Sequence, residues 1–472
     1  VGLEGMHRLL KDVQRDYPHL CKSFGKLVSK YHAFHKPSMT AEEGLHALTR
    51  AAVECITAEE PDWEFVAGRL YSFQNDLNIR RKMEGLQLQS LYDKLSYLTT
   101  EGYYGAYILE SYTKAEIDLA ETFLQPERDR LLTYSGLDLL LRRYTVRNFV
   151  HEQLETPQEM YLGIALHLAM RETQNRMDHV RAFYDMLSKQ QVSMATPTLA
   201  NARKPHHQMS SCFIDTVDDS LEGIYRSIAN FANVSKFGGG MGLYFGKVRA
   251  NGSDIRGYKG AAGGVIRWIK LANDTAVAVD QLGVRSGAVA CYLDVWHKDI
   301  LDFLQLRTNN GDDRMKAHDV FPAVCYPDLF WKKVREGLDQ SWYLMCPHEI
   351  QTIKGYALED SYGDEWEQRY NDCVNDARIT KTEVLLKDLI RLILKSAIET
   401  GTPFAFFRDH VNRMNPNKHK GIIYSSNLCV EIAQNMSPIQ SVKTETIKTA
   451  EGDDIIVEKT KAGDIDVCNL AS

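Results

Sequence analysis

The most unusual group of reactive side chains lies in residues 425–432, which read Ser-Ser-Asn-Leu-Cys-Val-Glu-Ile. In an extended segment alternate side chains share a face, so Asn427, Cys429 and Glu431 would point the same way. An amide can orient a hydroxyl, a carboxylate can accept a proton, and a thiol can act as a nucleophile or carry a radical. The alternative is a strand with one polar face, on which the cysteine is merely small. The residues alone leave these two interpretations evenly balanced.

The other cysteines argue against a disulfide scaffold or a metal centre. The sequence has nine cysteines at wide spacings, without a CxxC pair or a zinc-ligand spacing to histidine. This usage indicates a reducing compartment, where most thiols are buried and a few can be active. His206 and His207 have no carboxylate or cysteine at a useful spacing, so we expect no metal site. The glycines of residues 238–242 do not fit a dinucleotide-binding GxGxxG motif.

The elements that must position these residues change in kind near Gln191. Up to that point apolar residues recur with helical periodicity, and Asp62 precedes one such run as a candidate cap. Beyond it, short apolar runs alternate with helix patterns, which predicts a parallel α/β arrangement with both sheet faces covered. The predicted strands are 192–195, 211–214, 242–245, 288–293, 320–324, 342–345 and 404–407, and the predicted helices are 219–236, 263–278, 297–306, 327–336 and 382–399. Residues 440–461 predict a solvent-facing hairpin around Gly452-Asp453.

Composition excludes several classes of protein. The chain has 472 residues, of which 44% are apolar and 25% charged, as in an ordinary soluble globular protein. Its apolar runs are too short for a transmembrane helix, and the start lacks the features of a signal peptide, so we expect a cytoplasmic protein without a membrane partner. With 56 basic and 63 acidic residues the net charge is −7, which argues against a nucleic-acid partner. A local basic site for a small phosphorylated ligand remains compatible with this charge.

The pattern Asn-x-Cys-x-Glu resembles the finger loop of ribonucleotide reductase large subunits. Further motifs match that family in the same order, and the set most resembles the class I large (alpha) subunit, which reduces ribonucleoside diphosphates. The matching segments are residues 194–201, 210–212, 218–225, 249–253, 280–288, 292–297 and 467–472. The resemblance implies a ten-stranded α/β barrel of two half-barrels of parallel strands, with the finger loop threaded through its centre. Here a helical N-terminal region would precede the first part of that barrel.

The resemblance also implies a role for each residue of the site. Cys429 would become a thiyl radical and abstract the ribose 3′ hydrogen, Glu431 would take the 3′-hydroxyl proton, and Asn427 would hold the ribose hydroxyls. After loss of the 2′-hydroxyl as water, Cys212 and Cys468 would supply two electrons and close a disulfide. Taken alone, each of these two cysteines reads as a buried core thiol. Thr196 and Ser211 resemble residues that contact substrate phosphate and ribose; taken alone, each reads as a locally satisfied hydroxyl.

A second group of residues resembles the family's specificity site for ATP and deoxynucleoside triphosphate effectors. Asp219 would accept a hydrogen bond from the effector's deoxyribose, although a plain helix N-cap is the alternative. Arg249 would bind effector phosphate, or be a solvated charge at a strand end. Residues 257–264 resemble loop 1 of that site, a glycine-rich segment opening a helix. Gln281 and Arg285 lie in the equivalent of loop 2, which carries effector identity to the substrate site. In the family this site forms at a dimer interface, so a homodimer is implied.

The sequence departs from the family at both ends. Residues 1–85 resemble only part of an ATP-cone, without its nucleotide motif, which argues against an ATP/dATP on–off switch. Residues 86–190 would be the helical N-terminal domain and residues 191–472 the first part of the barrel. The resemblance stops at Ser472 before the second half-barrel, so both ends look cut. The missing half would come from a longer chain or from a separately encoded polypeptide.

Partners and alternatives follow from the same resemblance. We expect no cofactor bound in this chain, because a metal-containing small (beta) subunit would supply the radical. Two alternatives stay open: an adenosylcobalamin-dependent reductase, which makes the radical within one chain, and a non-catalytic nucleotide-binding half of a split protein. A cobalamin requirement would identify the first, and nucleotide binding that survives Cys429→Ala without any reductase activity would identify the second.

Overall fold

The computed structural model describes residues 2–280 and 286–472. The chain divides into two compact units, which are described separately below. A helical unit comprises the residues up to Met209 together with Leu470–Ser472, and a barrel unit comprises Ser210–Asn469. The division falls later in the chain than the change of pattern near Gln191, and the finer boundary expected after residue 85 stays a prediction.

The helical unit is built from short helices with well-defined starts. Its elements are α1 (Gly2–Asp16), η1 (Pro18–Ser23), α2 (Phe24–Phe34), α3 (Ala41–Val53), α4 (Trp63–Gly85), α5 (Leu91–Thr100), α6 (Tyr107–Ser111), α7 (Lys114–Glu121), η2 (Pro126–Leu131), α8 (Tyr134–Arg143), α9 (Pro157–Ala169), α10 (Arg176–Ser188) and α11 (Thr196–Asn201). Reciprocal capping boxes begin α3, α5, α7 and α9, each pairing a Ser or Thr cap with an acidic residue three positions on. The helical character predicted before residue 190 is therefore confirmed. Residues 157–188 form two helices, α9 and α10, because the chain turns between Ala169 and Arg176.

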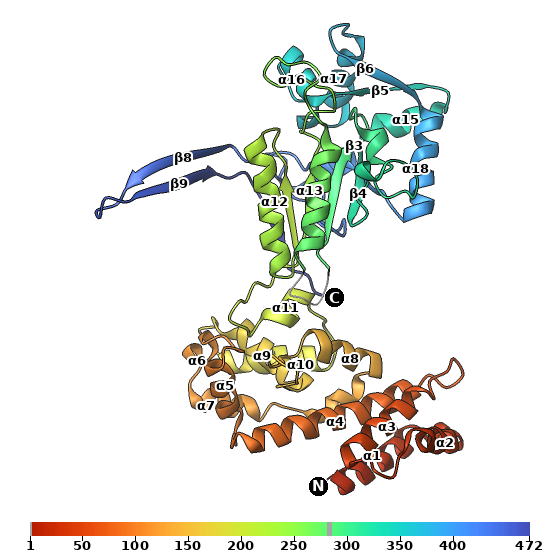
Figure 1. The fold of residues 1–472 in the computed structure, drawn as a ribbon, viewed down its shortest axis with the longest axis vertical. Helices are drawn as coiled ribbons and strands as arrows, with labels where there is room; N and C mark the ends of the chain where they lie inside the picture. Colours follow the sequence, from red (N-terminus) through yellow and green to blue (C-terminus); the bar gives the residue numbers. More distant parts are fainter. Residues whose placement is uncertain (1, 281–285) are drawn as a thin grey trace. The chain divides into compact units, whose positions relative to one another are not determined.

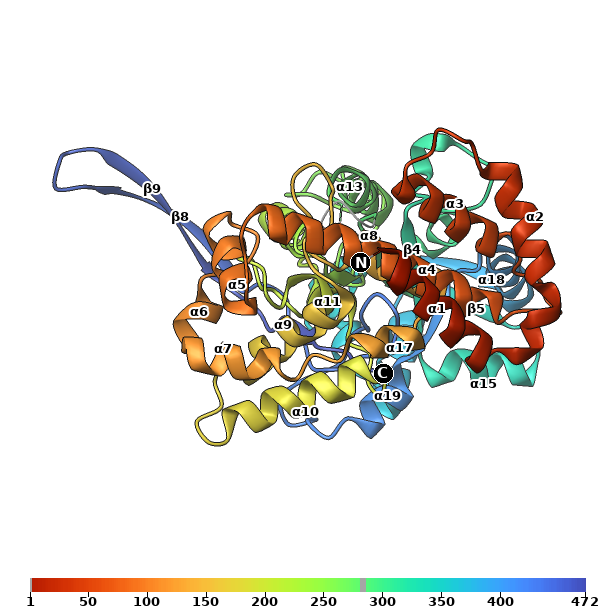
Figure 2. The same cartoon turned by 90° about the horizontal axis from the view of Figure 1, so that it is seen from below.

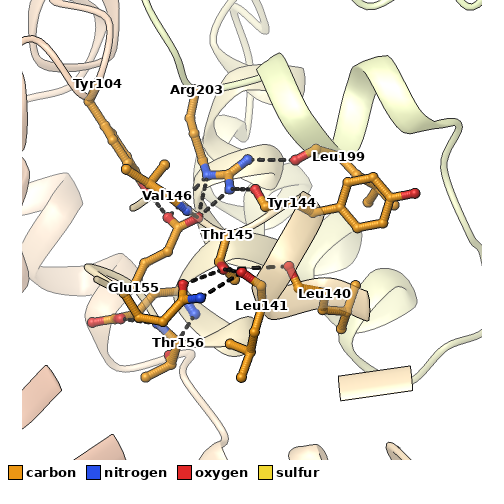
Figure 3. A network of polar contacts seen from close by, with 12 residues as sticks. Tyr104, Leu140, Leu141, Tyr144, Thr145, Val146, Glu155, Thr156, Leu199 and Arg203 are labelled. Carbon is orange, nitrogen blue, oxygen red and sulfur yellow. Dashed lines mark hydrogen bonds and ion pairs between the residues drawn. The ribbon is translucent and has the colours of Figure 1, made fainter. Parts of the chain in front are cut away.

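A buried ion pair links four segments of the helical unit (Figure 3). The Arg203 guanidinium donates from Nε to both oxygens of Glu155, at 3.0 and 3.1 Å, and its other nitrogens donate to the carbonyls of Leu199 and Tyr144. Glu155 also accepts from the Tyr104 hydroxyl at 2.5 Å. Arg203 is fully buried and Glu155 is 1% exposed. The pair therefore holds α11 in place, since Leu199 lies within that helix.

The centre of the barrel unit is a six-stranded sheet. Its strands run in the order β10 (Asp466–Cys468), β1 (Cys212–Thr216), β2 (Gly240–Tyr244), β3 (Val289–Asp294), β4 (Val320–Tyr326) and β7 (Phe404–Phe407). Within this sheet β1, β2, β3, β4 and β7 are parallel to one another, whereas β10 is antiparallel to β1. The unit's helices are α12 (Leu221–Lys236), α13 (Val265–Ala278), α14 (Ile300–Phe303), α15 (Asp328–Glu336), α16 (Pro347–Lys354), α17 (Gly363–Asn375), α18 (Leu386–Thr400) and α19 (Arg408–Met414). A helical region followed by parallel α/β structure confirms the predicted fold class.

The two faces of this sheet differ in side-chain size because alternate residues of a strand point to opposite faces. Helices α12 and α13 cover the outer face (Figure 1), where large residues such as Leu243 and Leu293 belong to the main hydrophobic core. On the inner face, β2 presents Gly240, Gly242 and Tyr244 in alternation. The small inner residues leave room for another segment to lie directly on the sheet.

The remaining strands form two separate pairs. Strands β5 (Ser341–Met345) and β6 (Lys381–Leu385) pair antiparallel, so the prediction that residues 342–345 belong to the parallel sheet is wrong. Strands β8 (Ser441–Lys448) and β9 (Asp454–Lys461) form the predicted hairpin, which projects from the barrel unit in both views (Figures 1 and 2). Residues 192–195 contribute only an isolated bridge between Met194 and Ala471. Within the described part of the chain, no helix is both long enough and apolar enough to cross a membrane.

Candidate active site

The segment that carries Cys429 is a turn and not an extended strand. The chain bends at residues 428–430, and Val430 adopts a positive φ of 69°. The amide side chain of Asn427 closes this turn, because its Oδ1 accepts hydrogen bonds from the backbone N–H groups of Glu431 and Ile432, both at 3.1 Å. The interpretation that places Asn427, Cys429 and Glu431 on one face of an extended segment is therefore wrong. The loop is instead preorganised by its own asparagine.

The loop lies directly on the inner face of the sheet. A Cβ added at Gly242 would meet the carbonyl oxygen of Ser426 and would lie 2.9 Å from Asn427 Cα. The Tyr292 hydroxyl on β3 donates to the Asn427 carbonyl at 2.6 Å. Only glycine permits so close an approach of two backbones, so β2 and β3 together fix the loop against the middle of the sheet.

Three of the predicted catalytic residues meet at this point. The Cys212 thiol donates to Glu431 Oε1 at 3.2 Å and accepts from the Ser211 hydroxyl at 3.4 Å. Burial raises the pKa of the Cys212 thiol to about 11, and the Glu431 carboxylate adds to that increase. Cys212 is therefore protonated at neutral pH, as its hydrogen bond to a carboxylate requires. The Asn427 Nδ2 is buried and makes no hydrogen bond of ordinary geometry among the described residues, and this amide faces the Cys212 sulfur, where it lowers the pKa of the thiol.

The Cys429 side chain is exposed at the tip of the turn. Negative charge on Glu431 and on Cys429 contributes, after burial, to raising the pKa of the Tyr292 hydroxyl. Cys429 and Glu431 belong to the same turn, and Tyr292 contacts the backbone of that turn through the Asn427 carbonyl.

Cys212 and Cys468 lie opposite each other across the antiparallel pair formed by β1 and β10. Directly opposed residues in such a pair have Cα atoms about 4.5 or 5.5 Å apart. A disulfide needs a Cα separation of roughly 4.4 to 6.8 Å. The register therefore brings together two thiols that are far apart in sequence, within reach of a disulfide.

The hydrogen bond between Cys212 and Glu431 yields a prediction. We expect Glu431→Gln to lower the pKa of the Cys212 thiol and to speed its alkylation at pH 8 by about threefold to tenfold, since less negative charge opposes the thiolate. The wild-type rate should rise with pH up to pH 9 without levelling, because a pKa of about 11 lies above that range. Peptide-resolved mass spectrometry after brief iodoacetamide exposure measures both effects.

A matched control for this prediction is Glu445→Gln, which removes an exposed carboxylate on the hairpin that pairs with Lys459. Its Cys212 rate should equal that of the wild type. Equal rates for Glu431→Gln and the wild type would contradict the hydrogen bond.

The two predicted substrate-binding hydroxyls belong to different units. Ser211 directly precedes β1 and contacts the Cys212 sulfur. Thr196 is the first residue of α11 in the helical unit, where its Oγ1 lies 3.2 Å from the Tyr144 hydroxyl. The buried Arg203–Glu155 pair fixes both Tyr144 and α11, so it also fixes the position of Thr196.

The predicted effector residues form a second polar cluster in the barrel unit. Arg249 binds Asp219 through both its backbone N–H and its Nε, at 2.9 Å each, and His348 Nδ1 lies 3.5 Å from the same carboxylate. Burial raises the pKa of the Asp219 carboxyl, whereas Arg249 and His348 act to lower it. The N-cap of α12 is Ser220, so the alternative of Asp219 as a plain cap is wrong. Gln281 and Arg285 lie outside the described residues.

Sequence reasoning missed the groups that hold the site together. Tyr292 and His348 received no role, and the glycines of residues 238–242 were considered only as a dinucleotide-binding motif, which they do not fit. The available signal was the alternation Gly240-x-Gly242-x-Tyr244, which marks a strand face that another backbone approaches closely. Across the described residues, no cluster of three or more His, Cys, Asp or Glu side chains could hold a metal ion.

A mixed half-barrel sheet carries a cysteine-bearing loop on its inner face, beside two opposed strand cysteines. This arrangement defines an α/β-barrel protein with a thiol site on the inner sheet face. Comparison with known proteins places it further. The family model described as "Ribonucleotide reductase, barrel domain" matches residues 210–472, and "Ribonucleotide reductase, all-alpha domain" matches residues 130–207. The chain therefore belongs to the ribonucleotide reductase large-subunit family, and the resemblance is confirmed.

Curated relatives agree with this assignment. The ribonucleoside-diphosphate reductase subunit alpha of Treponema pallidum (strain Nichols) is 63% identical over 464 residues, covering 98% of this chain and 55% of the relative. The protein of the same name from Helicobacter pylori (strain J99) is 41% identical over 414 residues, covering 85% of the chain and 49% of the relative. The large subunit from Variola virus is 33% identical over 396 residues, covering 83% and 49%. The chain thus spans about half the length of the curated relatives it matches.

Proposed function

We propose that this chain forms the N-terminal portion of a ribonucleoside-diphosphate reductase large subunit, which converts ribonucleoside diphosphates to 2′-deoxyribonucleoside diphosphates for DNA synthesis. The observation that carries the proposal is one local arrangement. The loop bearing Cys429 lies on the inner sheet face, and the opposed pair Cys212 and Cys468 lies at that sheet's β1–β10 edge. Such a site offers one exposed thiol for hydrogen-atom transfer and two others for electron supply.

The proposed division of labour follows the chemistry of each side chain. Cys429 acts as a thiyl radical that takes the ribose 3′ hydrogen. Glu431 accepts the 3′-hydroxyl proton, and Asn427 orients the ribose hydroxyls with its buried Nδ2 donor, which makes no hydrogen bond of ordinary geometry among the described residues. The 2′-hydroxyl leaves as water, while Cys212 and Cys468 give up two electrons and two protons and form a disulfide. Ser211 and Thr196 contact substrate ribose and phosphate.

Regulation and partners belong to the same proposal. Asp219 and Arg249, with Gln281 and Arg285, bind a nucleoside triphosphate effector that sets substrate specificity in a homodimer. The Asp219–Arg249 ion pair supports this, because it provides a sugar acceptor and a phosphate donor side by side. A metal-containing small subunit generates the radical, and the second half-barrel completes the site from the same or another polypeptide. The assembly works in the cytoplasm with a thioredoxin- or glutaredoxin-type reductant.

A single-turnover experiment tests the proposed function. The full product of the source coding region is reduced, freed of reductant, and mixed with its small subunit, a ribonucleoside diphosphate and an effector. We expect one deoxyribonucleoside diphosphate for each new disulfide between Cys212 and Cys468, detected as a cross-linked peptide pair. Adding dithiothreitol should restore multiple turnovers, because it reduces the Cys212–Cys468 disulfide. Product without that disulfide, or nucleotide binding without any product, would overturn the proposal.

A further inference from the structure

The segment that enters the cysteine-bearing loop is held at two successive residues. Asn412 on α19 donates from Nδ2 to the Ile423 carbonyl at 2.8 Å and accepts from the Ile423 N–H at 2.9 Å. This pair of hydrogen bonds imitates a strand partner, so it fixes the backbone just before Tyr424. Tyr424 in turn lies three positions before Asn427, the residue that closes the turn around Cys429.

The Tyr424 ring is packed among aromatic and charged groups. It stacks on Tyr244 with ring centroids 5.2 Å apart and an interplanar angle of 21°. Lys247 Nζ lies 4.6 Å from the ring centroid, and the Tyr424 hydroxyl donates to Asp360 at 2.6 Å. Stacking, cation–π contact and a charge-assisted hydrogen bond together leave this ring a single position.

A buried ion pair contacts both the Tyr424 ring and the Tyr244 ring on which it stacks. Arg408 Nη1 donates to Asp294 Oδ1 at 2.8 Å, and Tyr244 donates its hydroxyl to the other carboxylate oxygen at 2.5 Å. Arg408 is 3% exposed and Asp294 is 1% exposed. The guanidinium carbon of Arg408 lies 5.3 Å from the Tyr424 ring centroid and 5.8 Å from that of Tyr244. Its Nε and Nη2 have no hydrogen-bond partner among the described residues, so contact with the rings is their main compensation.

These groups come from the ends of three barrel strands. Tyr244 ends β2, Asp294 ends β3, and Arg408 directly follows β7. We infer that Arg408 and Asp294 are positioning residues, which lock Tyr244 against Tyr424 and so set the position of the loop that carries Cys429. The position of the loop is thereby fixed relative to three strands of the sheet. The relevance of this position to turnover rests on the proposed function, whereas the anchoring itself does not.

Hydrogen exchange on the full chain tests the anchoring directly. Arg408→Met removes the charge and the donors but keeps most of the side-chain length. We expect amide exchange in a peptide covering residues 422–432 to speed up by at least about tenfold, equivalent to ~1.4 kcal/mol of local opening. Exchange in α13, on the opposite sheet face, is the internal control for a general loosening of the fold. It should stay within about twofold of wild type. Arg408→Lys, which keeps one charged donor for Asp294, should restore part of the protection.

The matched control is Arg413→Met on the same helix, because Arg413 pairs with Asp328 at 2.7 Å but is 47% exposed. It should leave exchange in residues 422–432 unchanged. If Arg408→Met loosens α13 equally, Tyr424→Leu replaces it, since that change removes the stacked ring and leaves the ion pair intact. Unchanged protection of residues 422–432 in both Arg408→Met and Tyr424→Leu would overturn the inference.

A turnover measurement separates positioning from a general structural role. In the complete reductase, Arg408→Lys should lower kcat by about tenfold with KM within twofold, because a displaced thiol slows the reaction but leaves substrate contacts in place. A change confined to KM would contradict this account. If wild-type protein shows no reductase activity, the proposed function fails, while the exchange experiment still decides the anchoring.

Discussion

Arg203→Met is expected to lower the free energy of unfolding by about 3–5 kcal/mol, which is the cost of leaving a buried charge without its partner. Arg203 is fully buried, and its Nε, Nη1 and Nη2 all donate hydrogen bonds within the helical unit. After the substitution the Glu155 carboxylate keeps only the Tyr104 hydroxyl and the Val146 N–H as partners. Gly163 shows how closely the pair is enclosed, because a Cβ there would lie 2.7 Å from Arg203 Cδ.

Urea unfolding of the full chain, with hydrogen exchange of α9 to assign the transition to the helical unit, measures this effect. The matched control is Arg81→Met, since Arg81 pairs with Glu42 while 58% exposed and should cost no more than about 1 kcal/mol. The double variant Arg203→Met with Glu155→Leu should recover part of the loss, because it removes both charges. A loss below about 1 kcal/mol for Arg203→Met alone would show that the pair contributes little.

Much of the barrel unit is readable from local sequence patterns. The strands β1, β2, β3, β4 and β7 each carry a short apolar run bounded by helix signals, and β8–β9 carry an alternating pattern around a glycine turn. Such patterns report which face is buried, but not which strand is the neighbour. Residues 342–345 read like another barrel strand, yet they pair with β6, because pairing is decided by tertiary contacts.

The candidate site was predicted by residue type, whereas its geometry was not. Asn427 acts first on its own backbone, closing a turn that spacing alone makes look extended. The opposition of Cys212 and Cys468 depends on the antiparallel register of β10, which no local pattern encodes. Likewise, Asp219 follows β1 and Arg249 follows β2. They are neighbours only because these two strands are parallel, so that their carboxyl ends lie side by side. Sequence motifs named these residues, and the topology of the sheet explains why they meet.

Cys429→Ser is expected to abolish reductase turnover, by at least about a thousandfold, without disturbing the fold. The substitution keeps a small polar side chain at the exposed tip of the turn, where Asn427 holds the backbone through Glu431 and Ile432 and not through residue 429. Thermal unfolding and substrate affinity should therefore stay close to wild type. An alkoxyl radical is far harder to generate than a thiyl radical because an O–H bond is stronger than an S–H bond, so the radical cannot be stored on serine.

The matched control for this loss is Cys21→Ser, which changes the other exposed cysteine of the chain, on η1 of the helical unit. It should retain full activity in the same assay, with product formation followed by chromatography of labelled nucleotides. Cys212→Ser offers a contrast, because the proposed function assigns that thiol to the electron-supplying pair. It should block disulfide formation while leaving Cys429 able to exchange the 3′ hydrogen of the substrate. Retention of more than about a tenth of wild-type turnover by Cys429→Ser would exclude a thiyl radical at this position.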